Sequence, residues 1–166
     1  MDLQPILSNE LVTLKPLLKE DFELLYKIAS DKLLWEQHPN FDRYKREVFE
    51  DFFQKAIDSK GAFTIFDTKN NTVIGSTRFY NYDENSNTVV IGYTFIDRNL
   101  WGTAYNSSVK HLMMNYAFQF VENIHFHVGE TNFRSQKAVE KLDAIKIGEI
   151  KDDTSLKTNW IYELKK

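Results

Sequence analysis

Hydrophobic positions alternate in some parts of the chain and recur at helical intervals in others, and these two patterns predict strands and helices. An alternating run over residues 11–17 predicts a first strand, and apolar positions at helical spacing then predict helices that begin near Lys19 and at Arg46. Residues 34–40 form a predicted loop between these helices, because Pro39 does not allow a simple helical continuation. The chain is therefore expected to open with one strand and two helices.

Residues 62–96 change to the period of an extended chain. Three runs rich in β-branched and aromatic residues, 62–66, 72–80 and 88–96, are separated by turns rich in Asn and Asp. Connections this short join antiparallel neighbours, so the pattern predicts a three-stranded meander.

The rest of the chain alternates between helical and extended patterns. Apolar positions from Val109 to Val121 recur at helical intervals, so a long helix is expected to begin near Tyr105. A strand over 125–128, a helix after Asn132, and strands over 145–150 and 160–164 follow. A strand-helix-strand return of this length normally makes a right-handed parallel crossover. We predict a single α+β domain over residues 1–166, with a mixed, mostly antiparallel central sheet and flanking helices.

Composition narrows the chemistry without naming it. The 166 residues suffice for one substantial core, and the absence of cysteine excludes disulfides, a thiolate nucleophile and a thiolate metal site. A net charge of -3 with mixed signs gives no footprint for nucleic acid or an anionic membrane, and mildly favours a cationic substrate. His125 and His127 share one face of a predicted strand, but two ligands do not make a metal site, so no metal is expected.

The N-terminal sequence and the hydrophobic pattern also bear on location. No basic segment followed by an apolar run opens the chain, and no stretch approaches the length of a membrane span. A cytoplasmic protein is the expectation, with neither nucleic acid nor a membrane as partner.

Residues 92–106 combine the end of a strand, a glycine with small neighbours, and the start of a helix. Small residues at Gly102 and Ala104 let backbone amides approach a ligand closely, and the first amides of the next helix carry a partial positive charge. A diphosphate is the natural ligand of such a turn. An ordinary structural turn explains the same spacing, because the full dinucleotide fingerprint and the Lys-Ser/Thr of a P-loop are absent.

Four motifs taken in order resemble the GNAT superfamily of N-acetyltransferases, and most of all its branch of ribosomal-protein N-terminal acetyltransferases. The motifs are Ile91-Gly-Tyr-Thr-Phe-Ile, Leu100-Trp-Gly-Thr-Ala-Tyr-Asn, Leu112-Met-Met-Asn-Tyr-Ala-Phe, and Thr131-Asn-Phe-Arg-Ser-Gln-Lys-Ala-Val-Glu-Lys-Leu. The resemblance implies an acyl-CoA N-acyltransferase fold, in which acetyl-coenzyme A, as cosubstrate, lies between two splayed neighbouring strands.

The resemblance also implies which residues bind acetyl-coenzyme A. Backbone groups of the strand would bond the pantetheine arm, the turn would hold the diphosphate, and an Asn at the start of the later helix would face the arm. The implied residues are Thr94, Phe95, Ile96, Leu100, Trp101, Gly102, Thr103, Ala104, Tyr105, Asn106 and Asn132. A plain helix cap is the alternative role for Asn132.

The chain departs from the family's pattern at several positions. Asn99 stands where the diphosphate loop normally has Arg or Gln, which is tolerable because that loop binds mainly through backbone amides. No Tyr follows the later helix, so Ser135, as in the ribosomal branch, is the predicted proton donor to the leaving sulfur, with a plain first-turn Ser as the alternative.

The general base is the least defined part of the predicted site. Val89 and Val90 stand where relatives often carry Glu. Glu36 and Glu130 are the substitute candidates, and solvated surface acids or an ordered-water relay are the alternatives. A free amine loses its proton easily, so acetyl transfer does not demand a strong catalytic dyad.

The implied activity is acetyl transfer from acetyl-coenzyme A to a primary amine by direct attack in a ternary complex. The acceptor would be a protein or peptide N-terminus or a small amine, held by residues 34–44 and the hairpin 80–87. Trp35, His38, Phe41 and Tyr80 could form an aromatic wall there, although Trp35 could instead pack the early helices. A non-catalytic acyl-coenzyme A-binding or regulatory module is the alternative function, a scaffold or dimerisation domain is a weaker one, and a homodimer is left open.

Overall fold

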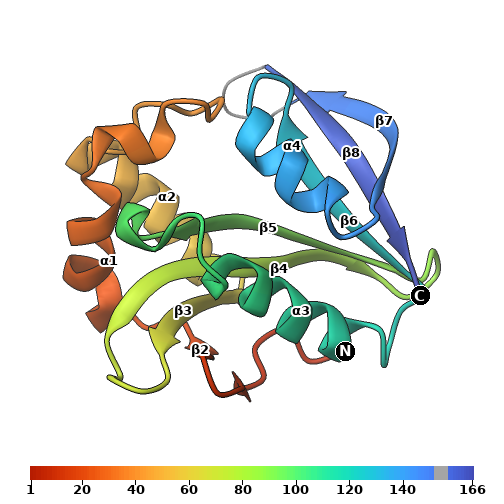
Figure 1. Ribbon diagram of the computed structural model, residues 1–166, viewed down its shortest axis with the longest axis horizontal. Coiled ribbons are helices and arrows are strands. Elements are labelled where there is room, and N and C mark those ends of the chain that lie inside the picture. Colours follow the sequence, from red (N-terminus) through yellow and green to blue (C-terminus); the bar gives the residue numbers. More distant parts are fainter. Residues whose placement is uncertain (152–156) are drawn as a thin grey trace.

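The computed structural model describes residues 1–151 and 157–166, and one eight-stranded sheet runs through them. The strand order is β1-β2-β3-β4-β5-β6-β8-β7 (Figure 1). Among the described strands, β5 and β6 form the parallel pair and all other neighbours are antiparallel. The strands are β1 (Leu7–Ser8), β2 (Val12–Pro16), β3 (Ala62–Asp67), β4 (Val73–Asp83), β5 (Thr88–Ile96), β6 (Asn123–Gly129), β7 (Ile145–Lys151) and β8 (Thr158–Lys165).

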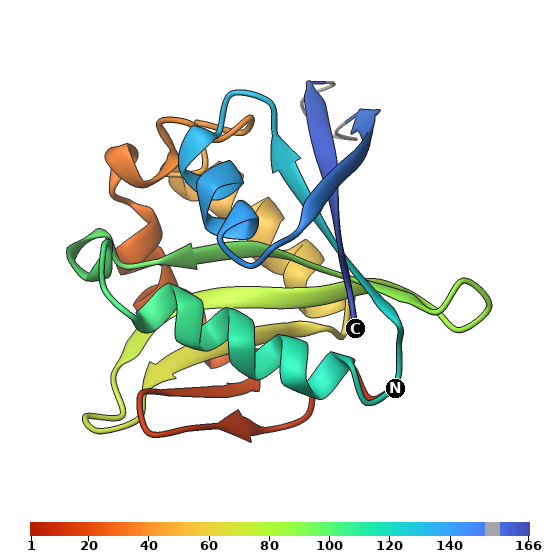
Figure 2. The ribbon, with the colours of Figure 1, turned by 45° about the vertical axis from the view of Figure 1, so that its right-hand side comes forward.

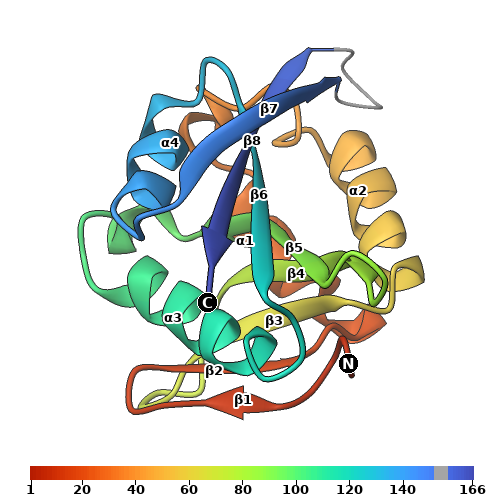
Figure 3. The same ribbon diagram turned by 90° about the vertical axis from the view of Figure 1, so that its right-hand side faces the viewer.

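Helices cover both faces of the sheet (Figure 3). The α-helices are α1 (Phe22–Ala29), α2 (Arg46–Asp58), α3 (Tyr105–Ala117) and α4 (Phe133–Glu140), and 3-10 turns occupy η1 (Lys19–Asp21), η2 (Lys32–Trp35) and η3 (Arg98–Leu100). One core lies between α1, α2 and the sheet, around Phe49, Phe53 and Phe95. The other lies between the opposite sheet face and α3 and α4, around Phe79, Met113 and Phe126.

The hydrophobic pattern predicts these elements well. The meander of β3, β4 and β5 is antiparallel, and β5, α3 and β6 make the expected parallel crossover. Strand β1 was not foreseen, because two residues are too short to show a period. The fold is the predicted α+β arrangement, with a mixed, mostly antiparallel sheet.

Strand pairing is incomplete at the centre of the sheet. Strands β5 and β6 pair only through Thr88 to Val90 and Asn123 to His125, although β5 continues to Ile96. The two strands start side by side and then diverge (Figures 1 and 2). Because β6 stays paired with β8 along its whole length, β5 is left with an edge that its parallel neighbour does not cover.

Candidate active site

A bulge shapes the part of β5 that has lost its parallel neighbour. Arg78 pairs with Gly92 and Ser76 with Phe95, so two residues of β5, Tyr93 and Thr94, oppose one residue of β4. Tyr93 takes a positive φ of 52° to accommodate the extra residue. The bulge re-aims the backbone and side chains of β5 where the two strands separate.

The side chains of Thr94, Phe95 and Ile96 are engaged inside the fold. The Thr94 hydroxyl lies 2.8 Å from the Thr77 hydroxyl and accepts a hydrogen bond from Lys110 Nζ at 2.7 Å. Phe95 and Ile96 are buried in the two cores. What this segment offers along its free edge is therefore backbone N–H and C=O, the groups expected to bond a pantetheine arm.

The turn that follows is built for close approach to its backbone. Gly102 has a φ of +73°, and a Cβ atom added there would meet no heavy atom within 4 Å. The Ser108 N–H donates to the Ala104 carbonyl at 2.9 Å and closes the first turn of α3, so the amides before it belong to the helix N-terminus. An open, glycine-containing turn leading into a helix suits an anionic diphosphate.

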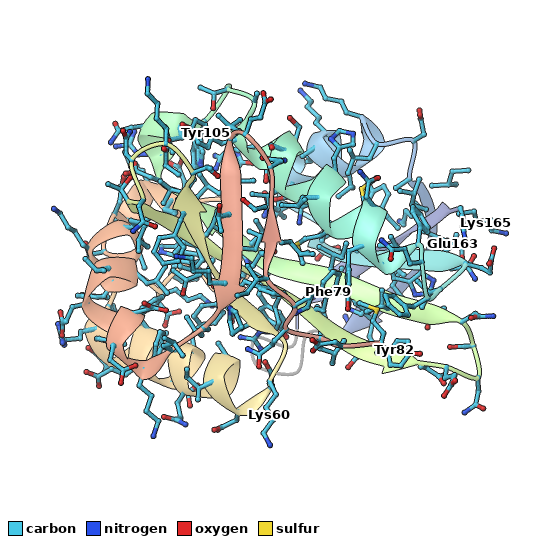
Figure 4. All side chains as sticks on the ribbon, turned by 90° about the horizontal axis from the view of Figure 1, so that it is seen from below. Lys60, Phe79, Tyr82, Tyr105, Glu163 and Lys165 are labelled. Atoms are coloured by element: carbon cyan, nitrogen blue, oxygen red, sulfur yellow. The ribbon has the colours of Figure 1, made fainter. Side chains whose placement is uncertain are left out.

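Side chains fix this turn to the body of the protein. The Trp101 indole N–H donates to the Ile96 carbonyl at 3.2 Å, and the Thr103 hydroxyl donates to the Leu100 carbonyl. The Tyr105 hydroxyl donates to the carboxylate of Asp67, the last residue of β3, and anchors the start of α3, where Tyr105 is labelled in Figure 4. These bonds leave the turn's backbone, more than its side chains, as the binding surface.

The start of α4 lies next to the same turn. The Arg134 guanidinium carbon lies 3.7 Å from the centroid of the Trp101 ring, and the Arg134 N–H donates to Gln37 Oε1 at 3.1 Å. Asn132 caps α4, since its Oδ1 accepts from the Ser135 N–H at 3.3 Å. The cap role of Asn132 is therefore observed, while the contacts of Asn132 and Ser135 with the cofactor remain predictions.

The two carboxylates considered as bases lie at the surface. Glu36 follows η2 and is exposed, and Glu130 follows β6 and is also exposed. Glu36 lines a shallow pocket with Lys32, Leu33 and Phe41, and neither carboxylate lines the larger cavity that the described residues form beside the bulge of β5. Val89 and Val90 are fully or almost fully buried, and because valine has no ionisable group neither position can supply a base.

A cavity of about 390 Å³ lies beside the bulge of β5. Residues 39–43 form one side, α2 forms another, and Arg78 of β4, Tyr93 of β5 and Lys157 complete the lining. Tyr93 thus belongs both to this cavity and to the diverging part of β5. Phe41 lines the cavity. Trp35 is only 3% exposed and packs in the core, the alternative role considered for it, and its indole N–H donates to the Ala29 carbonyl at 2.8 Å.

Tyr80 and His127 form a polar pair on the same face of the sheet. Their Oη and Nδ1 atoms lie 3.2 Å apart, and the Tyr80 ring lies 4.9 Å from the Tyr93 ring. A Cβ atom at Gly92 would lie only 3.0 Å from the Tyr80 ring, so glycine is what lets this ring lie over β5. Burial, and to a smaller degree the charge of His125, lowers the pKa of His127, which keeps its imidazole neutral at pH 7.

The sequence alone does not pair Tyr80 with His127. It indicates Tyr80 for an aromatic wall and His127 only as one of two histidines on a strand face. The residues lie 47 positions apart, and only the pairing of β4, β5 and β6 brings them together. Among the described residues, no group of three His, Cys, Asp or Glu side chains gathers at a position suited to a metal ion.

Comparison with known proteins identifies the family. Residues 12–145 match the model of the acetyltransferase (GNAT) domain. The chain belongs to the GNAT family. It is accordingly an acetyl-coenzyme A-dependent N-acetyltransferase that acetylates an amine.

Solved structures share the GNAT fold at low sequence identity. A GCN5-related N-acetyltransferase from Brucella melitensis has a TM-score of 0.83 at 17% identity, over 98% of this chain and 79% of that one. A candidate ribosomal-protein-serine acetyltransferase from Vibrio cholerae has a TM-score of 0.80 at 13% identity, over 100% of both chains. Spermidine N-acetyltransferase from Vibrio cholerae, solved with CoA and spermine, has a TM-score of 0.71 at 14% identity, over 95% and 96%. No curated protein matches the sequence.

The geometry of this GNAT chain fits its cosubstrate. The uncovered edge of β5, the open turn at Gly102 and the N-terminus of α3 together offer backbone groups to a long, diphosphate-containing molecule. No helix in the described part of the chain has the length and apolar character needed to cross a membrane.

Proposed function

We propose that this enzyme acetylates a primary amine held in the cavity beside Tyr93, by direct attack of the amine in a ternary complex. One observation carries the proposal: Tyr93 lies both on the uncovered segment of β5 and in the lining of the cavity. A cofactor along the strand and an amine in the cavity would therefore meet at the bulge. This arrangement supplies the proximity that accounts for much of the acceleration of a two-substrate transfer.

When bound, acetyl-coenzyme A supplies an acetyl group activated as a thioester. Residues 94–96 are proposed to orient it through backbone hydrogen bonds, with an N–H near Phe95 aimed at the carbonyl oxygen. Residues 100–106 would hold the diphosphate through the amides around Gly102 and the start of α3. Fixed backbone donors stabilise developing negative charge without having to reorganise.

The Tyr80–His127 pair is our proposed proton acceptor for the amine. The Tyr80 hydroxyl can donate to His127 Nδ1, and its oxygen would lie 3.1 Å from a Cβ atom at Gly92, next to the bulge. As the amine proton passes to the Tyr80 oxygen, the phenol proton passes to the neutral His127. We place this pair ahead of Glu36 and Glu130, because both carboxylates are exposed, whereas the Tyr80 ring lies 4.9 Å from the ring of Tyr93, which lines the cavity.

Ser135 remains our candidate for the proton donor to the departing sulfur, and Asn132 our candidate for a contact with the pantetheine arm. Ser135 is half-buried in the first turn of α4, and Asn132 precedes it as the cap. The family match and the continuous sheet support treating residues 1–166 as one N-acetyltransferase domain.

The test is a thiol-release assay with acetyl-coenzyme A and a panel of small amines and peptide N-termini. We expect turnover on at least one acceptor, and we expect His127→Gln to lower kcat about 100-fold with little change in KM for acetyl-coenzyme A. Tyr80→Phe should give a similar loss, and the double variant should lose no more than either single variant, because the two residues act as one unit. His111→Gln, an exposed histidine on α3, is the matched control.

Two results would contradict the proposal in different ways. If no acceptor is acetylated although calorimetry shows that acetyl-coenzyme A binds, the cavity is not the site of an amine acceptor. Full activity of His127→Gln would remove the proton relay and return the role of base to water or to an exposed carboxylate.

A further inference from the structure

The cavity beside Tyr93 has a predominantly basic lining. Four basic side chains face two acidic ones there: Arg43, Lys55, Arg78 and Lys157 against Asp42 and Asp51. Asp51 is bound to Lys55 at 2.7 Å in an exposed ion pair on α2. The local charge is therefore opposite in sign to the chain's net charge of -3.

Arg78 is the most unusual member of this lining. It is only 7% exposed, and its guanidinium carbon lies 4.2 Å from the centroid of the Tyr93 ring. Its Nε has no hydrogen-bond partner within the described structure, and no described carboxylate forms an ion pair with it. A buried charge without a counter-ion is costly, so its retention beside a cavity suggests a ligand that neutralises it.

Asn40, in the loop before α2, is a second buried side chain whose donor lacks a partner among the described residues. It is 9% exposed and lines the same cavity. Asn40 Nδ2 and Arg78 Nε are the buried side-chain polar atoms of the described structure that have no partner. Both atoms are donors, so what both lack is an acceptor.

We propose that the acceptor is a small primary amine that also carries a carboxylate or phosphate, and that Arg78 and Asn40 bind this anionic group. The inference rests on the proposed function and narrows its substrate. Because the Arg78 guanidinium lies against Tyr93 at the bulge, the anion is held within a few bonds of the reacting amine. Amino acids and short aminoalkyl phosphates have this spacing, and a cavity of about 390 Å³ is of a size for such molecules.

Polyamines fit this site poorly. A second ammonium group on the acceptor would face the buried Arg78 guanidinium, which has no ion pair with a described carboxylate, and like charges repel. On this proposal the charge of the cavity lining, and not the overall acidity of the chain, selects the substrate.

The experiment compares amines that differ only in the anion. The pairs are alanine with alaninamide, phosphoethanolamine with ethanolamine, and the peptides Ala-Asp-Gly-amide with Ala-Asn-Gly-amide, and spermidine is added as a polycation. Values of kcat/KM are compared per unprotonated amine, because the amine pKa differs within each pair. We expect the anionic member of the two small-molecule pairs to be preferred by at least about 10-fold.

Variants connect that preference to the two donors. Arg78→Met and Asn40→Leu should each reduce the ratio of kcat/KM between anionic and neutral members, Arg78→Met by about 10- to 100-fold. Arg78→Lys should keep part of the ratio, because it keeps the charge but loses the planar pair of donors. Arg46→Gln, an exposed arginine on α2 outside the lining, should leave the ratio unchanged. Thermal melts confirm that each variant is folded.

The outcomes separate this inference from the proposed function. Preference for alaninamide, ethanolamine or spermidine, or a ratio that survives Arg78→Met, overturns the anion site while acetyl transfer stands. Preference confined to the acidic peptide overturns the small-molecule assignment. If no amine turns over, the proposed function fails, and calorimetry decides the anion site: N-acetylalanine must bind more tightly than N-acetylalaninamide to the wild type and lose that advantage in Arg78→Met.

Discussion

Burial affects three basic side chains near the centre of the sheet in three different ways. Arg78 stays charged, because a guanidinium cannot lose its proton at any ordinary pH even where burial lowers its pKa. Burial lowers the pKa of Lys110 to about 7, and also lowers that of His127. One residue is therefore a fixed cation, one is half-neutralised near physiological pH, and one is neutral. These states match an anion site, a structural donor and a proton acceptor.

Lys110 should make the stability of the enzyme depend on pH. Its pKa is about 7 in the folded chain and 10.5 in an unfolded one, so between these values the unfolded state holds a proton that the folded state lacks. Unfolding then takes up a proton, and the free energy of unfolding rises with pH across this window. We expect a gain of about 2 kcal/mol between pH 7 and pH 9. Urea titrations at both pH values measure it.

Lys110→Met should abolish this gain and raise stability at pH 7, since an apolar side chain of similar length suits a buried position beside Phe126. Lys27→Met, at an exposed position on α1, should keep the gain. An unchanged pH dependence in Lys110→Met would mean that the Thr94 hydroxyl keeps the ammonium charged.

At the scale of elements, hydrophobic periodicity and turn residues predict the helices, the strands and the turn, but only part of the candidate site. The period of β5, the glycine at 102 and the start of α3 lie next to each other in the sequence, so short-range chemistry identifies them. The bulge at Tyr93 was not foreseen, because it depends on the register between β4 and β5. Trp35 packs in the core beside α1 and α2, and the sequence could not separate this role from a place in the aromatic wall.

Replacing Gly102 by Val tests the turn as a unit. A positive φ of +73° strains any β-branched residue, at a cost of about 1–3 kcal/mol of stability, although a Cβ atom there meets nothing within 4 Å. The new side chain projects into the space that a diphosphate would occupy. We expect the affinity for coenzyme A to fall more than 10-fold at a temperature where the variant is fully folded. Isothermal calorimetry and urea titration measure the two effects separately.

Gly148→Val in β7 is the matched control for this substitution. Gly148 also has open space around a Cβ atom and has no positive φ, so Val is compatible with its strand. Coenzyme A should bind this variant as it binds the wild type. Wild-type affinity in folded Gly102→Val would show that the turn is only structural.

At the scale of the whole molecule, the fold was predictable where sequence neighbours are also spatial neighbours, and the acceptor site was not. Asn40 and Arg78 line the cavity, and His127 contacts Tyr80. These residues come from a loop and two strands that are far apart in the chain, and no periodicity indicates these contacts. Net charge does not describe the cavity for a similar reason, because it averages over the entire surface. The mixed sheet followed from connection lengths, whereas the charge of one cavity depends on which side chains the register turns inward.

Because β5 and β6 pair over few residues, coenzyme A is expected to stabilise the folded protein by bridging the two parts of the sheet. Three residue pairs join these strands, whereas β6 and β8 pair over seven. A ligand that bonds the open edge of β5 and contacts α4 connects the two parts of the sheet. At 100 times its Kd, coenzyme A should add about 2.7 kcal/mol to the free energy of unfolding and raise Tm by roughly 5 to 10 °C.

Hydrogen exchange locates that stabilisation. On binding, amides of residues 91–96 and 102–106 should gain more protection than those of β3, which is already paired on both sides. ATP at the same concentration is the control for diphosphate binding without a pantetheine arm, and it should protect 102–106 without protecting 91–96. Equal protection of both segments by ATP and coenzyme A would mean that the edge of β5 is not where the arm lies, because only the arm can reach a strand edge from a diphosphate held at α3.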